Sequence, residues 1–237
     1  MCFDRWRCLA RRPRHVQTRE CDMTLVIFDC DGVLVDSEII FARISAEQFT
    51  ACGYPIDTET AIARFTGLSM PTMVGIVEAE LGRALPDDFA MRCRESANTI
   101  FDSELQAVEG IDGVLAQHAP HRCVASSSSP TRIRRSLKST GLYRHFKDEA
   151  IFSAAMVSRG KPAPDLFLHV ADEMASPVAD CVVIEDSLPG VQAAVAAGMT
   201  VLGFIGASHI QDGHAEKLRD AGAASIFDDM TALPGYL

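Results

Sequence analysis

The sequence predicts an α/β protein, and two observations lead to this fold class. From residue 106 onward, short apolar runs alternate with segments of helical character, which is typical of a parallel sheet covered by helices on both faces. Residues 37–105 interrupt this alternation because they show helical periodicity and no strong strand pattern. We therefore expect a Rossmann-like parallel sheet with a helical cap domain inserted after its first strand.

The first expected strand is the apolar run Leu25–Phe28, which ends at two carboxylates, Asp29 and Asp31, followed by Gly32. Ligands of open α/β sheets bind at the carboxyl ends of the strands, so both aspartates are candidate site residues. Two anions held this close repel each other, and the pair indicates either a bound cation or a nucleophile beside a proton donor. A solvated Asp-x-Asp-Gly turn is the alternative interpretation of these residues alone.

The cap is expected over residues 37–105, where turn sequences at 53–55 and 85–87 divide the helical pattern. The apolar residues that recur at helical spacing are Ile40, Ile44, Phe49, Ile62, Phe65, Met73, Ile76, Val77 and Leu81. The core domain would then consist of residues 23–36 and 106–237.

Later strands of the expected core also end in polar groups. Strand 122–126 leads into a serine cluster before a helix from Pro130, and strand 181–184 ends at Glu185 and Asp186. Lys161 lies between them in a loop stiffened by two prolines. The remaining elements expected are a strand near Ile151, a helix from Asp165, a helix from Pro189 to Ala197, the strand Val201–Phe204 and a helix near Ala215. Nucleophile-type, phosphate-binding and metal-binding groups are rarely combined in this order by chance.

These residues resemble the motifs of the haloacid dehalogenase-like phosphatases. The residues that match the family's four motifs are Asp29/Asp31, Ser126, Lys161 and Glu185/Asp186. Residues 28–38, FDCDGVLVDSE, are similar to the branch that holds β-phosphoglucomutase and small sugar-phosphate phosphatases. The resemblance covers residues 23–233.

The resemblance implies a role for each residue. Asp29 would be the nucleophile that forms an aspartyl-phosphate, and Asp31 the general acid and base. Mg²⁺ is the implied cofactor, and the ligands implied for it are Asp29, the main-chain carbonyl of Asp31, Asp186 and, through water, Glu185. The groups implied for phosphate binding are Ser126, Ser127 and Lys161, and Lys161 would also offset the charge of the carboxylates.

The expected substrate is a small sugar, polyol or sugar-acid phosphate. Residues 101–105 and 109–110 are similar to phosphatases that act on sugar or sugar-acid phosphates such as 6-phosphogluconate. Arg64, Ser69 and His209 are candidate specificity residues. The ordinary alternatives are a surface salt bridge for Arg64 and a loop-stabilising role for His209.

Two other functions compete with the phosphatase. A phosphosugar mutase must hold a second phosphate, and this chain has Thr66, Met70 and Phe41 where mutases carry lysine, arginine and histidine, which favours water as the acceptor. A non-catalytic sugar-phosphate sensor would not need the complete catalytic set. Asp31 argues against carbon–halogen or carbon–phosphorus cleavage, because relatives with those activities lack this second aspartate.

Charge and length limit the partners. The chain has 237 residues and a net charge of −10, which argues against binding to nucleic acid or to an acidic membrane surface. We expect a small-molecule phosphate ester as the partner and a monomer in solution. Residues 1–22 carry six arginines against three acidic residues, a charge of +3 that leaves −13 for the remainder. They are expected to be a disordered extension or the product of a start codon assigned too early; an organelle-targeting segment is the less favoured alternative.

The eight cysteines contain no Cys-x-x-Cys pair. Cys30, Cys123 and Cys181 fall in or beside expected strands, where a free cysteine behaves as a small apolar residue. Reduced thiols of this kind predict a cytoplasmic location.

Overall fold

A parallel six-stranded sheet forms the centre of the computed structural model, which describes residues 24–66, 68–118 and 121–237. The strand order among these residues is β3-β2-β1-β4-β5-β6, and every neighbouring pair is parallel. The strands are β1 (Leu25–Phe28), β2 (Arg122–Ser126), β3 (Ile151–Ser153), β4 (Cys181–Glu185), β5 (Thr200–Phe204) and β6 (Ser225–Phe227). The predicted α/β class with a Rossmann-like parallel sheet is confirmed.

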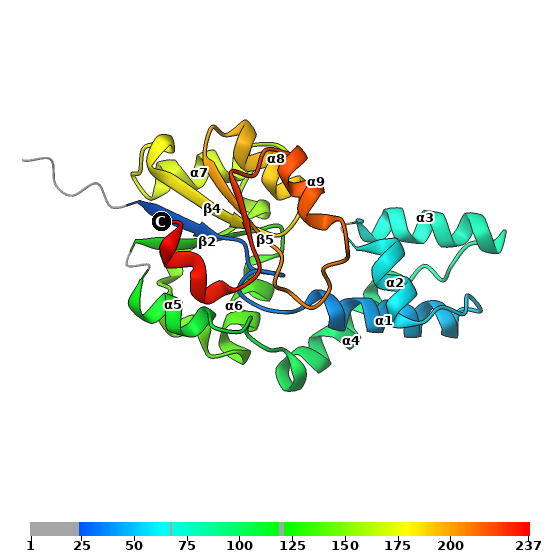
Figure 1. The fold of residues 1–237 in the computed structure, drawn as a ribbon. Helices are drawn as coiled ribbons and strands as arrows, with labels where there is room; N and C mark the ends of the chain where they lie inside the picture. The colour runs from blue at the N-terminus through cyan, green and yellow to red at the C-terminus, as the bar shows by residue number, and fades with distance from the viewer. Residues whose placement is uncertain (1–23, 67, 119–120) are drawn as a thin grey trace, which may run out of the picture.

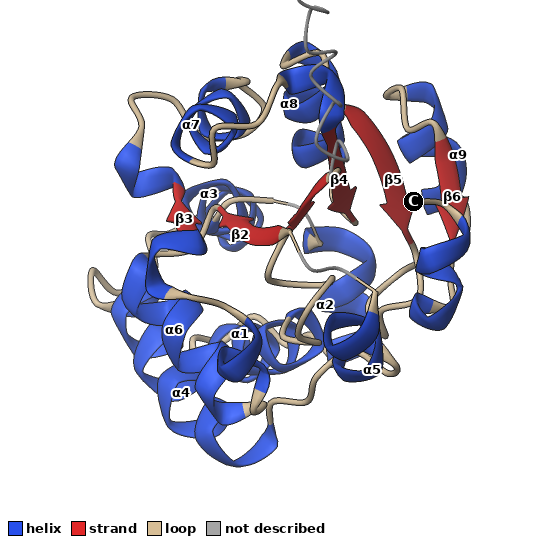
Figure 2. Ribbon diagram, turned by 90° about the vertical axis from the view of Figure 1, so that its left-hand side faces the viewer, coloured by secondary structure: helices blue, strands red, loops and turns tan. Residues whose placement is uncertain are grey.

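Helices cover both faces of this sheet (Figures 1 and 2). One face carries α5 (Ile111–Gln117) and α6 (Pro130–Ser139), and the other carries α7 (Asp165–Glu173), α8 (Leu188–Ala196) and α9 (His214–Asp220). Successive strand residues alternate between the two cores: in β1, Val26 and Phe28 join the first and Leu25 and Ile27 the second. Short 3₁₀ helices lie at η1 (Leu142–His145), η2 (Asp148–Ala150), η3 (Ala154–Met156), η4 (Val178–Asp180) and η5 (Met230–Gly235).

Four helices lie between β1 and α5 in the described part of the chain, and α1 to α3 extend away from the sheet (Figure 1). They are α1 (Glu38–Ala51), α2 (Thr58–Phe65), α3 (Met70–Leu81) and α4 (Phe89–Glu104). Their core is aromatic: the Phe49 ring lies 4.7 Å from that of Phe89 and 5.5 Å from that of Phe65 between centroids. The predicted breaks at 53–55 and 85–87 fall between helices, and a further break separates α2 from α3. The exact limits of a cap domain stay a prediction.

The segments that join these helices to the sheet pair with each other. Val35 and Ala107 form an antiparallel bridge. On either side of it, the Asp36 amide donates to the Gln106 carbonyl and the Val108 amide to the Leu34 carbonyl, both at 3.0 Å. The chain therefore leaves the core and returns to it through adjacent, hydrogen-bonded segments.

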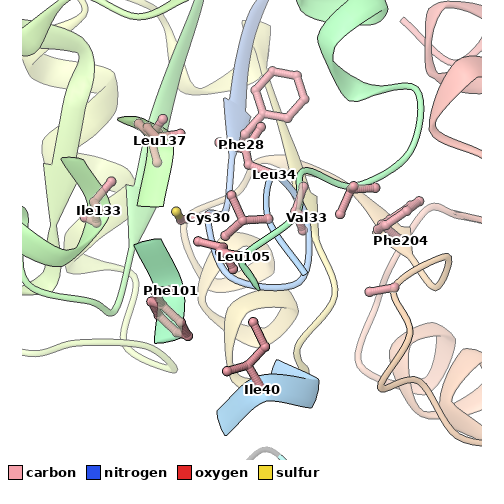
Figure 3. Packing of buried hydrophobic residues seen from close by; sticks show 14 of the residues in the cluster. Phe28, Cys30, Val33, Leu34, Ile40, Phe101, Leu105, Ile133, Leu137 and Phe204 are labelled. Atoms are coloured by element: carbon pink, nitrogen blue, oxygen red, sulfur yellow. The ribbon is translucent and has the colours of Figure 1, made fainter. Parts of the chain in front are cut away.

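The five cysteines in the described ranges are free. Cys30, Cys123 and Cys181 are buried as predicted, and Figure 3 shows Cys30 among apolar side chains that include Ile133, Leu137 and Leu105. Burial and the flanking aspartates raise the pKa of the Cys30 thiol well above its usual value, so Cys30 is not an activated nucleophile. Residues 1–22, with their predicted disorder, lie outside the described residues.

Within the described ranges no single helix is long and apolar enough to cross a bilayer. Helices α2 and α3 reach that length only together, across a bend of 112°.

Candidate functional site

The candidate site lies where the three central strands end. β1 is hydrogen-bonded to β2 on one side and to β4 on the other, with Phe28 in register with Val124 and Ile184. The Asp29 amide extends this pairing by donating to the Ile184 carbonyl at 3.0 Å. Residues far apart in the sequence therefore meet at one edge of the sheet, as the sequence pattern predicts.

Lys161 joins the ends of these strands. Its Nζ lies 2.6 Å from Asp29 Oδ1 and 2.5 Å from Glu185 Oε1, and it donates to the Ala125 carbonyl at 3.0 Å. The lysine side chain is only 4% exposed. Burial alone would lower the pKa of Lys161, but Asp29 and Glu185 outweigh it and raise this pKa above its usual value. Lys161 is therefore a fixed positive charge between two buried carboxylates.

A third carboxylate completes an acidic cluster. Ligand oxygens of Asp29, Glu185 and Asp186 lie within 4.8 Å of one another, and all three residues are buried. Burial raises the pKa values of Asp29 and Asp186 well above the usual range, and the neighbouring carboxylates add to this rise. Lys161 is the single cation bonded to this cluster among the described residues, so the carboxylates hold more negative charge than it balances. A buried, oxygen-rich, under-neutralised cluster fits a hard divalent cation such as Mg²⁺.

Asp31 has hydrogen-bond partners that are different from those of Asp29. Its Oδ1 accepts from Ser37 Oγ at 2.6 Å and from Arg132 Nη2 at 3.2 Å, and its Oδ2 accepts from Ser128 Oγ at 2.7 Å. Burial favours a higher pKa for Asp31, but Arg132 and the two hydroxyls outweigh it and hold the pKa below its usual value. Asp29 and Asp31 thus occupy different electrostatic environments.

Glu185 and Asp186 are oriented by the start of α8 and by two histidines. Glu185 Oε2 accepts from both the amide and the hydroxyl of Ser187, at 2.9 and 2.8 Å. His214 Nε2 donates to the Asp186 carbonyl at 2.6 Å, and His209 Nε2 lies 3.2 Å from Asp186 Oδ2. His209 is therefore brought to the site, where it contacts an acidic residue.

Gly32 allows the loop to pass close to Asp186. Its φ is +85°, and a methyl group on it would lie 2.0 Å from Asp186 Oδ2.

We expect Gly32→Ala to displace the Asp186 carboxylate, to lower the free energy of unfolding by roughly 3 kcal/mol and to weaken Mg²⁺ binding. Gly82→Ala is the matched control, because Gly82 has φ +67° and open space around it. It should cost about 1 kcal/mol from backbone strain alone. If urea unfolding showed that the two variants lose the same free energy of unfolding, the close approach of Gly32 to Asp186 would be contradicted.

The other predicted site residues lie in three different situations. Ser126 is buried at the end of β2, where its Oγ accepts from the Ser128 amide at 3.0 Å, while Ser127 is exposed. Arg64 forms an exposed ion pair with Glu80 at 2.6 Å. Ser69 caps α3 by accepting from the Thr72 amide at 3.3 Å. Arg64 and Ser69 thus bond within the helical segment, and their role in specificity stays a prediction.

Sequence reasoning did not predict the hydrogen bonds that hold the acidic residues, although Ser128 was considered as a residue at the entrance of the site or as a helix cap. The groups that form these hydrogen bonds are Ser37, Ser128 and Arg132 around Asp31, Ser187 beside Glu185, and His214 beside Asp186. Ser37 and Ser187 carry a local signal, because each follows an acidic residue and immediately precedes a helix. Arg132 carries none, since its partner lies 101 positions earlier in the chain.

Comparisons with known proteins identify the family of this chain. Residues 26–204 match the model of the haloacid dehalogenase-like hydrolase family. The chain is 35% identical over 185 residues to a 6-phosphogluconate phosphatase from Escherichia coli, covering 78% of this chain and 83% of that protein.

Two solved structures are similar to this chain over most of its length. A conserved haloacid dehalogenase-like protein of unknown function from Agrobacterium tumefaciens is 38% identical with a TM-score of 0.84, covering 90% of this chain and 97% of that one. A putative β-phosphoglucomutase from Thermotoga maritima is 25% identical with a TM-score of 0.73, covering 90% and 98%. The matched family model spans most of the chain, including the ends of β1, β2 and β4, and the chain therefore belongs to the haloacid dehalogenase-like hydrolases.

Proposed function

We propose that this hydrolase is a Mg²⁺-dependent phosphatase that releases phosphate from a small sugar, polyol or sugar-acid phosphate. The observation that carries the proposal is that the two aspartates have different hydrogen-bond partners. Asp29 accepts from Lys161 within the acidic cluster, whereas Asp31 accepts from hydroxyl groups and from a guanidinium. The similarity to a 6-phosphogluconate phosphatase supports the substrate class.

The proposed chemistry assigns each proton and bond to a residue of the chain. An Asp29 carboxylate oxygen attacks phosphorus and the bond to the ester oxygen breaks. Asp31, whose pKa is held low, takes up a proton from solvent before this step and gives it to the leaving oxygen. A water then attacks the aspartyl-phosphate, and Asp31 takes its proton. Lys161 offsets the charge of Asp29 and of the phosphoryl oxygens throughout. Ser126, Ser127 and Lys161 are the proposed phosphate-binding groups.

The acidic cluster would hold the Mg²⁺ ion. We assign its ligands to the carboxylates of Asp29 and Asp186 and to the main-chain carbonyl of Asp31. Both oxygens of Glu185 already accept hydrogen bonds, from Lys161 and from Ser187, which suits contact through water. The bound ion would neutralise charge on the phosphoryl oxygens.

Mg²⁺ affinity should rise with pH. The pKa values of Asp29 and Asp186 are raised, so protons must leave before the ion binds. Calorimetric titration of metal-free protein with MgCl₂ between pH 6 and pH 8 should show proton release and tighter binding at the higher pH. Without metal the stability trend is opposite: the folded state binds these protons more tightly than the unfolded chain, so stability falls as pH rises through the raised pKa values. A pH-independent affinity would contradict the assigned ligands, and Asp186→Asn should weaken binding at least about tenfold.

The mutase is the second candidate, supported by the likeness to a putative β-phosphoglucomutase. Thr66 and Met70 lack the charge that would hold a second phosphate, and the one nearby cation of α2, Arg64, is paired with Glu80. β-Glucose 1-phosphate with a trace of the 1,6-bisphosphate separates the two functions. A phosphatase yields free phosphate, and a mutase yields glucose 6-phosphate.

The proposed function is tested by phosphate release with Mg²⁺ across sugar, polyol and sugar-acid monophosphates. Release from at least one class, abolished by a chelator and restored by Mg²⁺, is the expected result. Folded protein that binds Mg²⁺ and a sugar phosphate but turns over neither this panel nor the mutase substrate would be a non-catalytic sensor. The cytoplasmic location and the monomeric state stay predictions.

A further inference from the structure

Arg132 lies between the sheet and helices α1 and α4, which belong to the helical segment α1–α4 inserted between β1 and α5. It is the third residue of α6, and its Nη2 lies 3.2 Å from Asp31 Oδ1. Its guanidinium carbon stands 5.0 Å from the ring centroid of Phe101 in α4 and 6.0 Å from that of Phe41 in α1. The side chain is 28% exposed, so it is partly open to solvent beside the acid/base position.

The cation keeps most of its hydrogen-bonding capacity. The bond to Asp31 is the one hydrogen bond from its side chain to another residue in the described ranges, and its Nε is buried with no partner there. Aromatic rings attract a guanidinium through their faces without using its in-plane N–H groups. Five such donors in a planar fork match the two oxygens of a carboxylate.

This free capacity is on the leaving-group side of the site. Lys161 bonds to Asp29, Glu185 and the Ala125 carbonyl on the side of the site that is assigned to the phosphoryl group. Asp31 has to reach the ester oxygen if it protonates the leaving group, so the rest of that group must lie near Asp31 and its partner Arg132.

We propose that Arg132 binds a carboxylate on the leaving group, which makes sugar-acid phosphates the preferred substrates of this enzyme. The inference rests on the proposed phosphatase function. The substrate carboxylate accepts from the N–H groups of the guanidinium that its bond to Asp31 leaves free.

Besides Asp31, Glu38 is a nearby carboxyl that would oppose a second anion. Burial and the adjacent Asp31 raise the pKa of Glu38 to about 7, so this carboxyl is only partly ionised at neutral pH. The space beside Arg132 therefore carries less negative charge than its residues suggest, which favours entry of a carboxylate.

The test compares gluconate 6-phosphate with glucitol 6-phosphate, which differ in a carboxylate against a hydroxymethyl group. Wild-type protein should show the higher kcat/KM for gluconate 6-phosphate. Arg132→Gln should reduce this preference roughly 10- to 100-fold, because a charge-assisted hydrogen bond to the substrate is lost. Arg132→Lys should keep part of the preference for gluconate 6-phosphate. Arg135→Gln is the matched control: Arg135 lies on the same helix and pairs with Asp102 of α4, so its loss removes a similar contact without changing the preference.

A second measurement separates recognition from a structural effect. Gluconate should inhibit the wild type more strongly than glucitol does, and Arg132→Gln should remove this difference. The inference is overturned if the wild type has no preference, or if Arg132→Gln lowers kcat/KM for both substrates equally and leaves both inhibitors unchanged. Release of phosphate from neither substrate, nor from any other monophosphate, would instead overturn the proposed function.

Discussion

Replacing Asp29 with asparagine should abolish phosphate release, with a fall in kcat of at least about 10⁴-fold. The amide has nearly the shape of the carboxylate but cannot attack phosphorus. The fold should survive, because Asp29 is a buried carboxyl whose pKa is raised by burial and by its acidic neighbours. Removing this charge relieves repulsion within the cluster, so the metal-free variant should melt at the same or a higher temperature than the wild type.

Phosphate release and acid-quenched mass spectrometry together check this result. Wild-type protein quenched during turnover should carry one added phosphoryl group on the peptide that contains Asp29, and Asp29→Asn should carry none. Asp87→Asn, at an exposed position among the inserted helices, is the control and should behave as the wild type. A phosphorylated peptide elsewhere in the chain would identify a different nucleophile.

Replacing Lys161 with methionine should cause the largest loss of stability in the core. The substitution leaves Asp29 and Glu185 buried without their cation. Breaking a buried ion pair in this way lowers the free energy of unfolding by roughly 3–5 kcal/mol. The loss should be greatest above neutral pH, where the carboxylates are ionised, and smaller at pH 5, where protonation removes the repulsion. Activity should fall as well, because no other cation bonds to Asp29 in the described part of the chain.

Urea unfolding of metal-free protein at pH 5 and pH 8 measures this effect. Lys217→Met, on the exposed side of α9, is the control and should change stability by less than about 0.5 kcal/mol. Addition of Mg²⁺ should restore part of the stability lost in Lys161→Met. A variant as stable as the wild type at both pH values would show that the lysine does not neutralise the cluster.

The strands and the residues that follow them were predictable because their signal is local. Each of β1, β2 and β4 is a short apolar run that ends in polar residues, and the parallel arrangement brings those ends together. β6 was not predicted, because its three residues offer too short a pattern. The break between α2 and α3 was also missed, although a glycine at position 67 precedes Ser69 as a cap and Pro71 in the first turn of α3.

The partners of the acidic residues could not be predicted, for a different physical reason. Arg132 meets Asp31 only because α6 packs beside β1, and nothing in the sequence near Arg132 distinguishes it from the arginines at 134 and 135. The ion pair of Arg64 with Glu80 likewise depends on how α2 meets α3. Contacts of this kind are set by tertiary packing, which local patterns do not encode.

The paired segments around Val35 and Ala107 suggest how members of this family diversify. Because the chain exits and re-enters the core at neighbouring points, the length and shape of what lies between them put no strain on β1 or β2. An entire helical segment can therefore be exchanged by recombination at two sites, while the residues proposed to bind phosphate are inherited unchanged. Arg132 is encoded in the core, outside that exchangeable segment. A preference for acidic substrates would then be inherited with the catalytic residues, and grafting helices from a relative should leave it in place.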